Sequence, residues 1–254
     1  MPKVAIAPRK TSAVKMGDAP DGGNARGGGR VADKTISGFA RRSLARAFAV
    51  VVTLFARFVT AVRGQWVGNE PSRKRRIYFA NHTSHGDFVL IWIVLPPRLR
   101  RKTRPVAASD YWLKSKLRSF IGRDVFHAVL IDRNKETRTE DPIALMQDAV
   151  DRGASLILFP EGRRNDTDAP LLPLKAGIYN LAVSRPHIEL VPVWIENLNR
   201  VMPRGEFIPV PLMCTVTFGP TMQVAEGEPV GAFLDRARDA LLALKPARNG
   251  SASP

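Results

Sequence analysis

The sequence is poor in the side chains that form disulfides or hold metals. Its 254 residues contain one cysteine, Cys214, and four histidines. A single cysteine excludes an internal disulfide, which agrees with a reducing compartment. His82 and His85 are three residues apart, but only His127, His187 and Cys214 are left to complete a set of ligands, so we do not expect a closed zinc site.

Acidic residues and long apolar runs are also scarce. The chain has 23 Asp and Glu against 39 Lys and Arg, a net charge of +16, and a surface of this kind attracts anions. The most apolar helical run, residues 47–62, has 16 residues and contains Arg57. About 20 apolar residues are needed to span a bilayer, so we expect this run to lie at a membrane interface.

The first 36 residues have few large apolar side chains and are rich in Gly, Ala, Lys and Arg. They also lack the apolar core and cleavage site of a secretory signal, so we expect a disordered basic tail on the cytoplasmic side. Residues 37–67 predict a helix that carries five arginines. This helix is expected to associate with a membrane, and the alternative is a basic helix that covers the core.

Strand-like and helix-like segments alternate along the rest of the chain. Strand patterns occur at residues 77–80, 106–109, 125–131, 156–159, 188–194 and 207–218. Helical patterns occur at residues 88–95, 111–121, 142–152, 171–183 and 231–244. The alternation predicts a single α/β domain, residues 68–246, with a mixed, largely parallel sheet flanked by helices. Residues 247–254 are expected to form a flexible tail.

Polar residues that suit proton transfer follow the first predicted strand of this domain. Asn81 and His82 come directly after it, and Asp87 precedes the next helix. The carboxyl edge of a sheet is where open α/β folds bind ligands, so His82 is a candidate base and Asp87 a candidate partner for its ring. The spacing of Ser84 and Asp87 also fits a helix capping box, and spacing alone favours the cap.

A second polar turn follows the strand pattern at residues 156–159. There Glu161, Arg163 and Arg164 leave one carboxylate and two guanidinium groups exposed. Taken together, the two turns resemble the glycerolipid acyltransferases, and the lysophosphatidic acid acyltransferases in particular. The first motif of that family is Asn-His, four residues and Asp, which is found here from Asn81 to Asp87.

The third motif of the family is Phe-Pro-Glu-Gly-x-Arg, which residues 159–164 match with Arg164, or Arg163 in another register. Weaker matches lie at residues 130–133, 173–177 and 191–193, and the resemblance covers residues 75–220. This chain differs from the family at two positions associated with acceptor binding. It has His127 where the family usually has glycine, and Arg163 where the family usually has threonine.

The resemblance implies a reaction and roles for particular residues. His82 would take the proton of a glycerol hydroxyl and Asp87 would orient its ring, while the hydroxyl attacks a thioester, acyl-coenzyme A or acyl-carrier protein. The acceptor would be a lysoglycerophospholipid, foremost 1-acyl-sn-glycerol-3-phosphate. No covalent intermediate, cofactor or metal is required. The residues expected to bind substrate are Asn81, Arg133, Glu161, Gly162, Arg163, Arg164 and Lys175.

The resemblance further implies a monotopic or peripheral protein on the cytoplasmic face of the membrane, with lipids and the acyl donor as partners. Other interpretations stay open. The acceptor could be glycerol 3-phosphate or another lysolipid. Charge alone suggests a nucleic-acid-binding protein, although most aromatic residues lie inside apolar runs, which disfavours that interpretation. A zinc hydrolase is a third possibility. Arg133 could equally form a surface ion pair, and Glu161 could simply be a polar turn residue.

Overall fold

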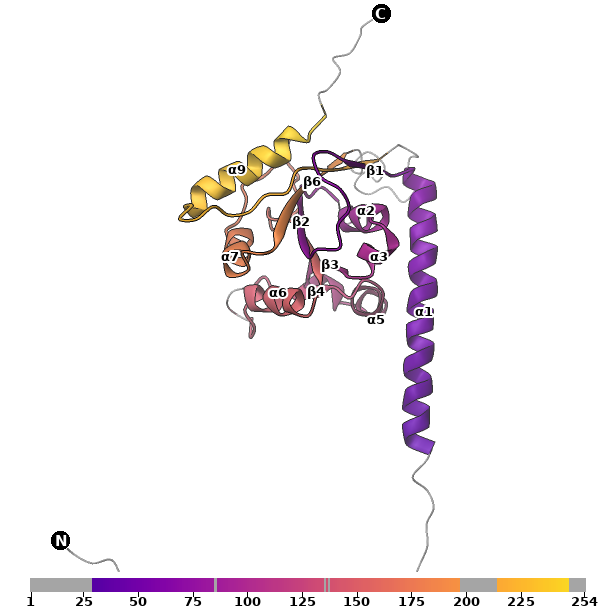
Figure 1. The fold of residues 1–254 in the computed structure, drawn as a ribbon. Coiled ribbons are helices and arrows are strands. Elements are labelled where there is room, and N and C mark those ends of the chain that lie inside the picture. The colour runs from indigo at the N-terminus through magenta and orange to yellow at the C-terminus, as the bar shows by residue number, and fades with distance from the viewer. Residues whose placement is uncertain (1–28, 85, 135, 137, 197–213, 247–254) are drawn as a thin grey trace, which may run out of the picture. The chain divides into compact units, whose positions relative to one another are not determined.

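The computed structural model describes residues 29–84, 86–134, 136, 138–196 and 214–246 (Figure 1). By its internal contacts the chain divides into Met1–Phe39 and Ala40–Pro254. The predicted tails at residues 1–28 and 247–254 lie outside the described residues, as do residues 207–213 of the last predicted strand.

The first helix differs from the prediction at both ends. Helix α1 runs from Gly29 to Thr60, so residues 29–36, expected in the tail, are helical. Ala61 has a φ of 42°, which ends the helix, and residues 63–66 form strand β1 (Arg63–Trp66). The prediction of helix up to residue 67 was therefore wrong, because pairing with a distant strand decides the backbone conformation there.

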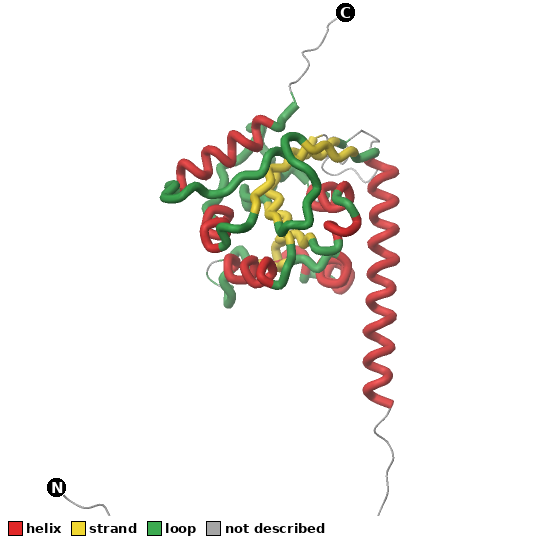
Figure 2. Tube along the Cα trace, in the orientation of Figure 1, coloured by secondary structure: helices red, strands yellow, loops and turns green. Residues whose placement is uncertain are grey.

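The described part of the chain forms a seven-stranded sheet in the order β1-β7-β6-β2-β5-β3-β4. Neighbouring strands are parallel except β6 and β7, which confirms the predicted mixed, largely parallel α/β fold. Figure 2 shows the strands running between helices. The strands after β1 are β2 (Arg76–Ala80), β3 (Thr103–Ala108), β4 (Val129–Ile131), β5 (Ser155–Leu158), β6 (Glu189–Glu196) and β7 (Thr215–Phe218).

Alternate residues of β2 belong to two separate hydrophobic clusters, because successive side chains of a strand point to opposite faces of the sheet. Tyr78 and Ala80 pack with helix α2 (Asp87–Val94) on one face. Ile77 and Phe79 pack on the other face. The helices of that second face are α6 (Pro142–Asp151), α7 (Gly177–Ser184) and α9 (Val230–Ala243). With both faces covered, ligands must approach β2 and β5 at an edge of the sheet.

The segment between β3 and β4 is broken into short pieces. It contains α4 (Ser109–Trp112), α5 (Lys116–Phe120) and a π-helix, η1 (Ile121–Val125). The sequence predicted one helix at residues 111–121 and a strand from residue 125. The chain instead turns at Leu113, and β4 begins only at Val129. A further short helix, α3 (Pro97–Arg100), follows α2.

Helix α1 contacts the rest of Ala40–Pro254 through one face. Ala45 is buried, Phe48 makes an edge-to-face contact with Phe120, and Arg41 forms an ion pair of 2.8 Å with Asp124. Apolar side chains are exposed elsewhere on α1: Leu44, Val50, Val51 and Leu54. Within the described residues, no helix combines the length and the apolar character needed to cross a membrane.

Candidate active site

The two sequence motifs meet at the carboxyl ends of neighbouring parallel strands. Strand β2 pairs with β5 in the register Ile77↔Leu156 to Phe79↔Leu158, so the turns that follow them are adjacent. Two hydrogen bonds join these turns directly. The backbone N–H of His82 donates to Glu161 Oε1 at 2.7 Å, and the N–H of Asn165 donates to the carbonyl of His82 at 2.6 Å.

His82 and Asp87 form a hydrogen-bonded pair. His82 Nδ1 lies 2.8 Å from Asp87 Oδ2, and the Asp87 side chain is fully buried. The same oxygen accepts the backbone N–H groups of Thr83 and Ser84 at 2.7 and 2.9 Å. Because a carboxylate oxygen can only accept, Nδ1 is the donor in this bond, and in a neutral ring the lone pair is then on Nε2.

The capping-box interpretation of Ser84 and Asp87 was wrong in its main feature. Helix α2 begins at Asp87, its N-cap residue is Gly86, and no side chain bonds the cap. Asp87 does accept the N–H of Ser84, as an acid at N3 would, but that bond fixes the loop that carries His82. His85, which the metal alternative required, lies outside the described residues. The described residues contain no cluster of three or more potential ligands for a metal.

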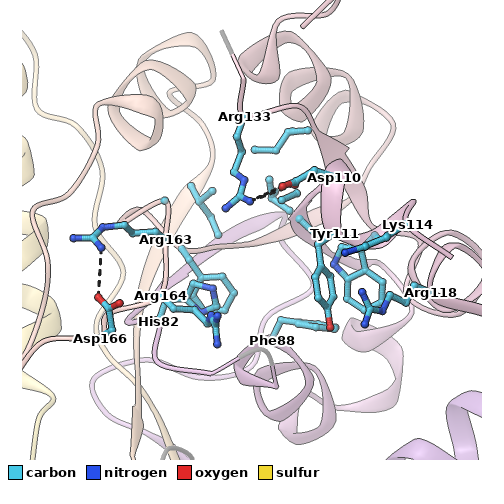
Figure 3. A pocket seen from close by; sticks show the side chains of 18 residues that line it. His82, Phe88, Asp110, Tyr111, Lys114, Arg118, Arg133, Arg163, Arg164 and Asp166 are labelled. Atoms are coloured by element: carbon cyan, nitrogen blue, oxygen red, sulfur yellow. Dashed lines mark hydrogen bonds and ion pairs between the residues drawn. The ribbon is translucent and has the colours of Figure 1, made fainter. Parts of the chain in front are cut away.

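The His82 ring stacks on Phe159, with centroids 4.2 Å apart and planes at 19°. Its side chain is 19% exposed and lines a cavity of about 630 Å³ (Figure 3). Among the described residues no partner holds Nε2, the nitrogen opposite the bond to Asp87. The ring is therefore held on one edge by Asp87 and against one face by Phe159, while the side chain lines the cavity.

Glu161 positions the protein backbone instead of facing the cavity. The residue is 2% exposed, and its second oxygen, Oε2, accepts the N–H of Leu172 at 2.8 Å. Burial raises the pKa of Glu161 above its usual value, and the N–H groups of Leu172 and His82 oppose that rise. The expected contact with substrate does not fit this geometry, because both oxygens are already used inside the protein.

Asn81 is likewise turned away from the cavity. Its amide donates to the carbonyl of Ile195 at 3.0 Å and accepts the N–H of the same residue at 2.8 Å. These two hydrogen bonds to the backbone of β6 give both polar atoms of the Asn81 amide a partner, although the residue is only 3% exposed. In this geometry Asn81 ties the end of β2 to its neighbouring strand, and substrate binding by Asn81 stays a prediction.

The cavity itself combines an apolar surface with positive charge. Its apolar residues include Phe88, Val106, Ile131, Leu158 and Phe159. Its cationic residues are Lys114, Arg118, Arg133, Arg163 and Arg164, against two carboxylates, Asp110 and Asp166. The cavity therefore suits an amphipathic ligand that carries an anionic group.

The predicted cations differ in how they are held. Arg133 pairs with Asp110 at 2.9 Å and Arg163 with Asp166 at 3.4 Å, both on the cavity wall. Arg164 lines the cavity and has no acidic partner among the described residues. Sequence analysis missed Lys114 and Arg118 as site residues, although the expected helix at residues 111–121 already showed basic and aromatic side chains side by side.

Two residues, His127 and Gly162, have left-handed backbone conformations. His127 has a φ of 49°, a left-handed conformation that glycine adopts most easily, which accounts for the glycine usual in the family at this position. Gly162 has a φ of 71°, and a Cβ atom there would lie 2.6 Å from Lys175 Nζ. Lys175 thus packs behind the turn, and the described cavity wall includes Gly162 but not Lys175.

The one cysteine is not available as a nucleophile. Burial, assisted by the nearby Asp87, raises the pKa of Cys214 to about 11, so its thiol stays protonated near neutral pH. Among the described residues, His82 is the only histidine on the cavity wall. The arrangement can therefore deprotonate a hydroxyl held beside an anionic group, and it contains no activated thiol to form a covalent acyl-enzyme.

Comparisons with known proteins identify the family of this chain. The chain is 31% identical over 158 residues to 1-acyl-sn-glycerol-3-phosphate acyltransferases of Limnanthes alba and Limnanthes douglasii, covering 60% of this chain and 52% of each relative. It therefore spans about half the length of these curated relatives. The crystal structure of 1-acyl-sn-glycerophosphate acyltransferase PlsC from Thermotoga maritima has the same fold, with a TM-score of 0.61 at 16% identity over 87% of this chain and 90% of that one. The sequence model of the acyltransferase family matches residues 63–196, so the chain belongs to the acyltransferase family.

Proposed function

We propose that this protein transfers a fatty acyl group from a thioester donor to the free hydroxyl of 1-acyl-sn-glycerol-3-phosphate, producing phosphatidic acid. The observation that carries the proposal is the bond of 2.8 Å between His82 Nδ1 and Asp87 Oδ2. It presents Nε2 to a cavity that also contains Arg164. A base and a cation side by side suit an acceptor that bears a hydroxyl close to a phosphate.

In the reaction, Nε2 of His82 takes the proton of the acceptor hydroxyl as its oxygen attacks the thioester carbonyl. Asp87 stabilises the imidazolium that forms, and the backbone N–H groups of Thr83 and Ser84 keep the carboxylate oriented. When the C–S bond breaks, the imidazolium returns its proton to the departing thiolate. The products are an ester and a free thiol, and His82 is again neutral.

The charge of the cavity supports a phosphorylated acceptor. In 1-acyl-sn-glycerol-3-phosphate only two carbons separate the reacting oxygen from the phosphate ester oxygen. The phosphate must therefore bind close to His82. Arg164 meets this requirement, because the next residue, Asn165, donates its N–H to the carbonyl of His82. The acyl chains would contact the apolar wall at Phe88, Val106 and Leu158.

We also propose that α1 holds the protein against a membrane surface. Leu44, Val51 and Leu54 are about 60% exposed, at 62%, 61% and 63%. Arg41, Arg42 and Arg46 are exposed on the same helix and can approach anionic headgroups. Since a lysolipid acceptor resides in the membrane, peripheral binding through α1 would bring the enzyme to its substrate.

The decisive experiment supplies purified protein with one isotope-labelled acyl donor and a panel of acceptors, read by mass spectrometry. The panel contains 1-acyl-sn-glycerol-3-phosphate, glycerol 3-phosphate and lysophospholipids with larger headgroups. We expect labelled phosphatidic acid as the main product, and about 10²- to 10⁴-fold less of it from the His82→Ala variant. Preferred acylation of another acceptor would replace the proposed substrate. Absence of any labelled lipid from every acceptor would refute the proposed activity.

A further inference from the structure

The cationic residues of the cavity form two groups on different elements. Arg163 and Arg164 belong to the turn after β5, which is hydrogen-bonded to the backbone of His82. Lys114 and Arg118 belong to the segment of α4 and α5. Figure 3 shows Arg163 and Arg164 on the side of His82, and Lys114 and Arg118 across the cavity, beyond Tyr111.

The second group is available for an anion. The Arg118 guanidinium lies over the Tyr111 ring, 4.5 Å from its centroid, which fixes its position without neutralising its charge. Lys114 is exposed, and neither Lys114 nor Arg118 has an acidic partner among the described residues. Arg133 and Arg163, in contrast, are each paired with an aspartate.

The two substrates of the proposed reaction place their phosphates differently. The acceptor phosphate is close to the reacting hydroxyl, whereas in the donor a whole pantetheine arm separates the thioester carbon from the nearest phosphate. Both carbonyl and hydroxyl must meet at His82 Nε2. The donor phosphate therefore cannot share Arg164 with the acceptor and must bind farther from His82.

We propose that Lys114 and Arg118 bind the phosphate of a phosphopantetheine thioester, the group that acyl-coenzyme A and acyl-carrier protein have in common. This inference rests on the proposed acyl transfer. The pantetheine arm crosses the cavity from α5 to His82, past Phe88 and Tyr111 on the cavity wall. The acceptor phosphate binds Arg164. Each substrate therefore has separate cationic residues, and the two phosphates bind at different places in the cavity.

The test measures binding without turnover. Full-length protein is titrated with coenzyme A, and in a parallel arm with phosphopantetheinylated acyl-carrier protein, by isothermal titration calorimetry. The test variant is Lys114→Gln with Arg118→Gln, which keeps a long side chain at both positions and over Tyr111 at position 118. Lys116→Gln is the matched control, because Lys116 is an exposed neighbour on α5 that does not line the cavity.

We expect the double variant to weaken binding of one or both probes about tenfold or more, since charge-assisted hydrogen bonds to phosphate are lost. Lys116→Gln and Arg164→Gln should bind like the wild type. The arm with the larger loss identifies the carrier. Unchanged binding in the double variant, an equal loss in Arg164→Gln, or no binding of either probe to the wild type would overturn the inference.

Steady-state kinetics separate this inference from the proposed function. The double variant should raise the KM for the acyl donor and leave the KM for the acceptor unchanged. If the wild type acylates the acceptor and the double variant keeps its donor KM, the inference fails and the proposed function stands. If no acyl transfer is found although coenzyme A binding requires Lys114 and Arg118, the proposed function fails and the anion site stands.

Discussion

Glu161 Oε1 accepts the backbone N–H of His82 at 2.7 Å, across 79 positions of the sequence. Its other oxygen accepts the N–H of Leu172 at 2.8 Å. One buried carboxylate thus joins the turn after β2, the turn after β5 and the loop that leads to α7. The two motifs act as one unit because Glu161, in the second motif, binds the backbone of His82, the proposed base in the first motif.

We predict that Glu161→Gln lowers kcat by about 10- to 100-fold while changing either KM much less, because displacing a reacting group by about 1 Å costs this much. Glutamine has one acceptor oxygen, so either His82 or Leu172 loses the partner of its N–H group. Steady-state kinetics measure the effect, and Glu226→Gln, at an exposed glutamate, is the control. A variant with a raised acceptor KM and normal kcat would instead indicate that Glu161 contacts the substrate.

Loss of the base should be the most severe single change. His82→Ala is expected to lower kcat by about 10²- to 10⁴-fold, the usual contribution of a general base. Asp87→Asn should also be impaired, since a neutral amide does not stabilise the imidazolium as a carboxylate does. Activity is followed as release of free thiol, with His187→Ala, at an exposed histidine, as the control. Turnover within a few-fold of wild type in His82→Ala would show that another group removes the proton.

Arg164 and Arg163 should differ in their effect on the acceptor. Arg164→Ala is expected to raise the acceptor KM by about 10- to 100-fold, as for the loss of a charge-assisted bond. Arg163→Ala should have a smaller effect because Arg163 is already paired with Asp166. Arg152→Ala, at an exposed arginine outside the cavity, serves as the control. Equal acceptor KM values for all three variants and the wild type would show that the acceptor phosphate binds at another place.

A stabilising ion pair lies at the amino end of β2, far from the site. Lys74, and after it Arg76, hold the pKa of Glu189 below its usual value of 4.5. A carboxylate whose pKa is lower in the folded state stabilises the fold above the unfolded pKa, and this contribution disappears as pH falls through the folded pKa. We expect Glu189→Gln to reduce the free energy of unfolding at pH 7 by about 1.5–3 kcal/mol.

Urea unfolding at several pH values measures this contribution. The difference between wild type and Glu189→Gln should be constant from pH 7 to 6 and should shrink below the usual glutamate value of 4.5. Lys74 is exposed, but Arg76 is buried. The Glu189→Gln substitution therefore leaves the buried Arg76 guanidinium without its carboxylate partner. A difference that does not change with pH would mean that packing, and not charge, is the source of the effect.

The exposed apolar side chains of α1 should control membrane binding without affecting the fold. Val51→Ser with Leu54→Ser is expected to reduce co-sedimentation with anionic vesicles, since each fully buried side chain contributes about 1.5–3 kcal/mol. Val183→Ser, at an exposed valine of α7, is the matched control. Salt should weaken wild-type binding only in part, because the apolar contribution is not screened. Undiminished sedimentation of the double variant would assign the membrane contact to another surface.

The sequence by itself determined the local parts of this protein. Apolar runs separated by helical patterns determined the alternation of strands and helices, since burial on a sheet requires that pattern. The position of His82 at the end of one strand and of residues 160–164 at the end of another placed both at the carboxyl edge. The spacing from His82 to Asp87 allowed the bond that the structure contains.

Only the tertiary structure decided which groups meet across the chain. Glu161 and Asn81 face inward because backbone N–H and C=O groups of distant segments lie within reach of them. Residues 63–66 form a strand because β7 offers them a partner, and Lys114 reaches the cavity because the chain bends at Leu113. A hydrophobic pattern reports how buried a residue is. It carries no information about which hydrogen-bonding group lies opposite, because that depends on packing between segments far apart in sequence.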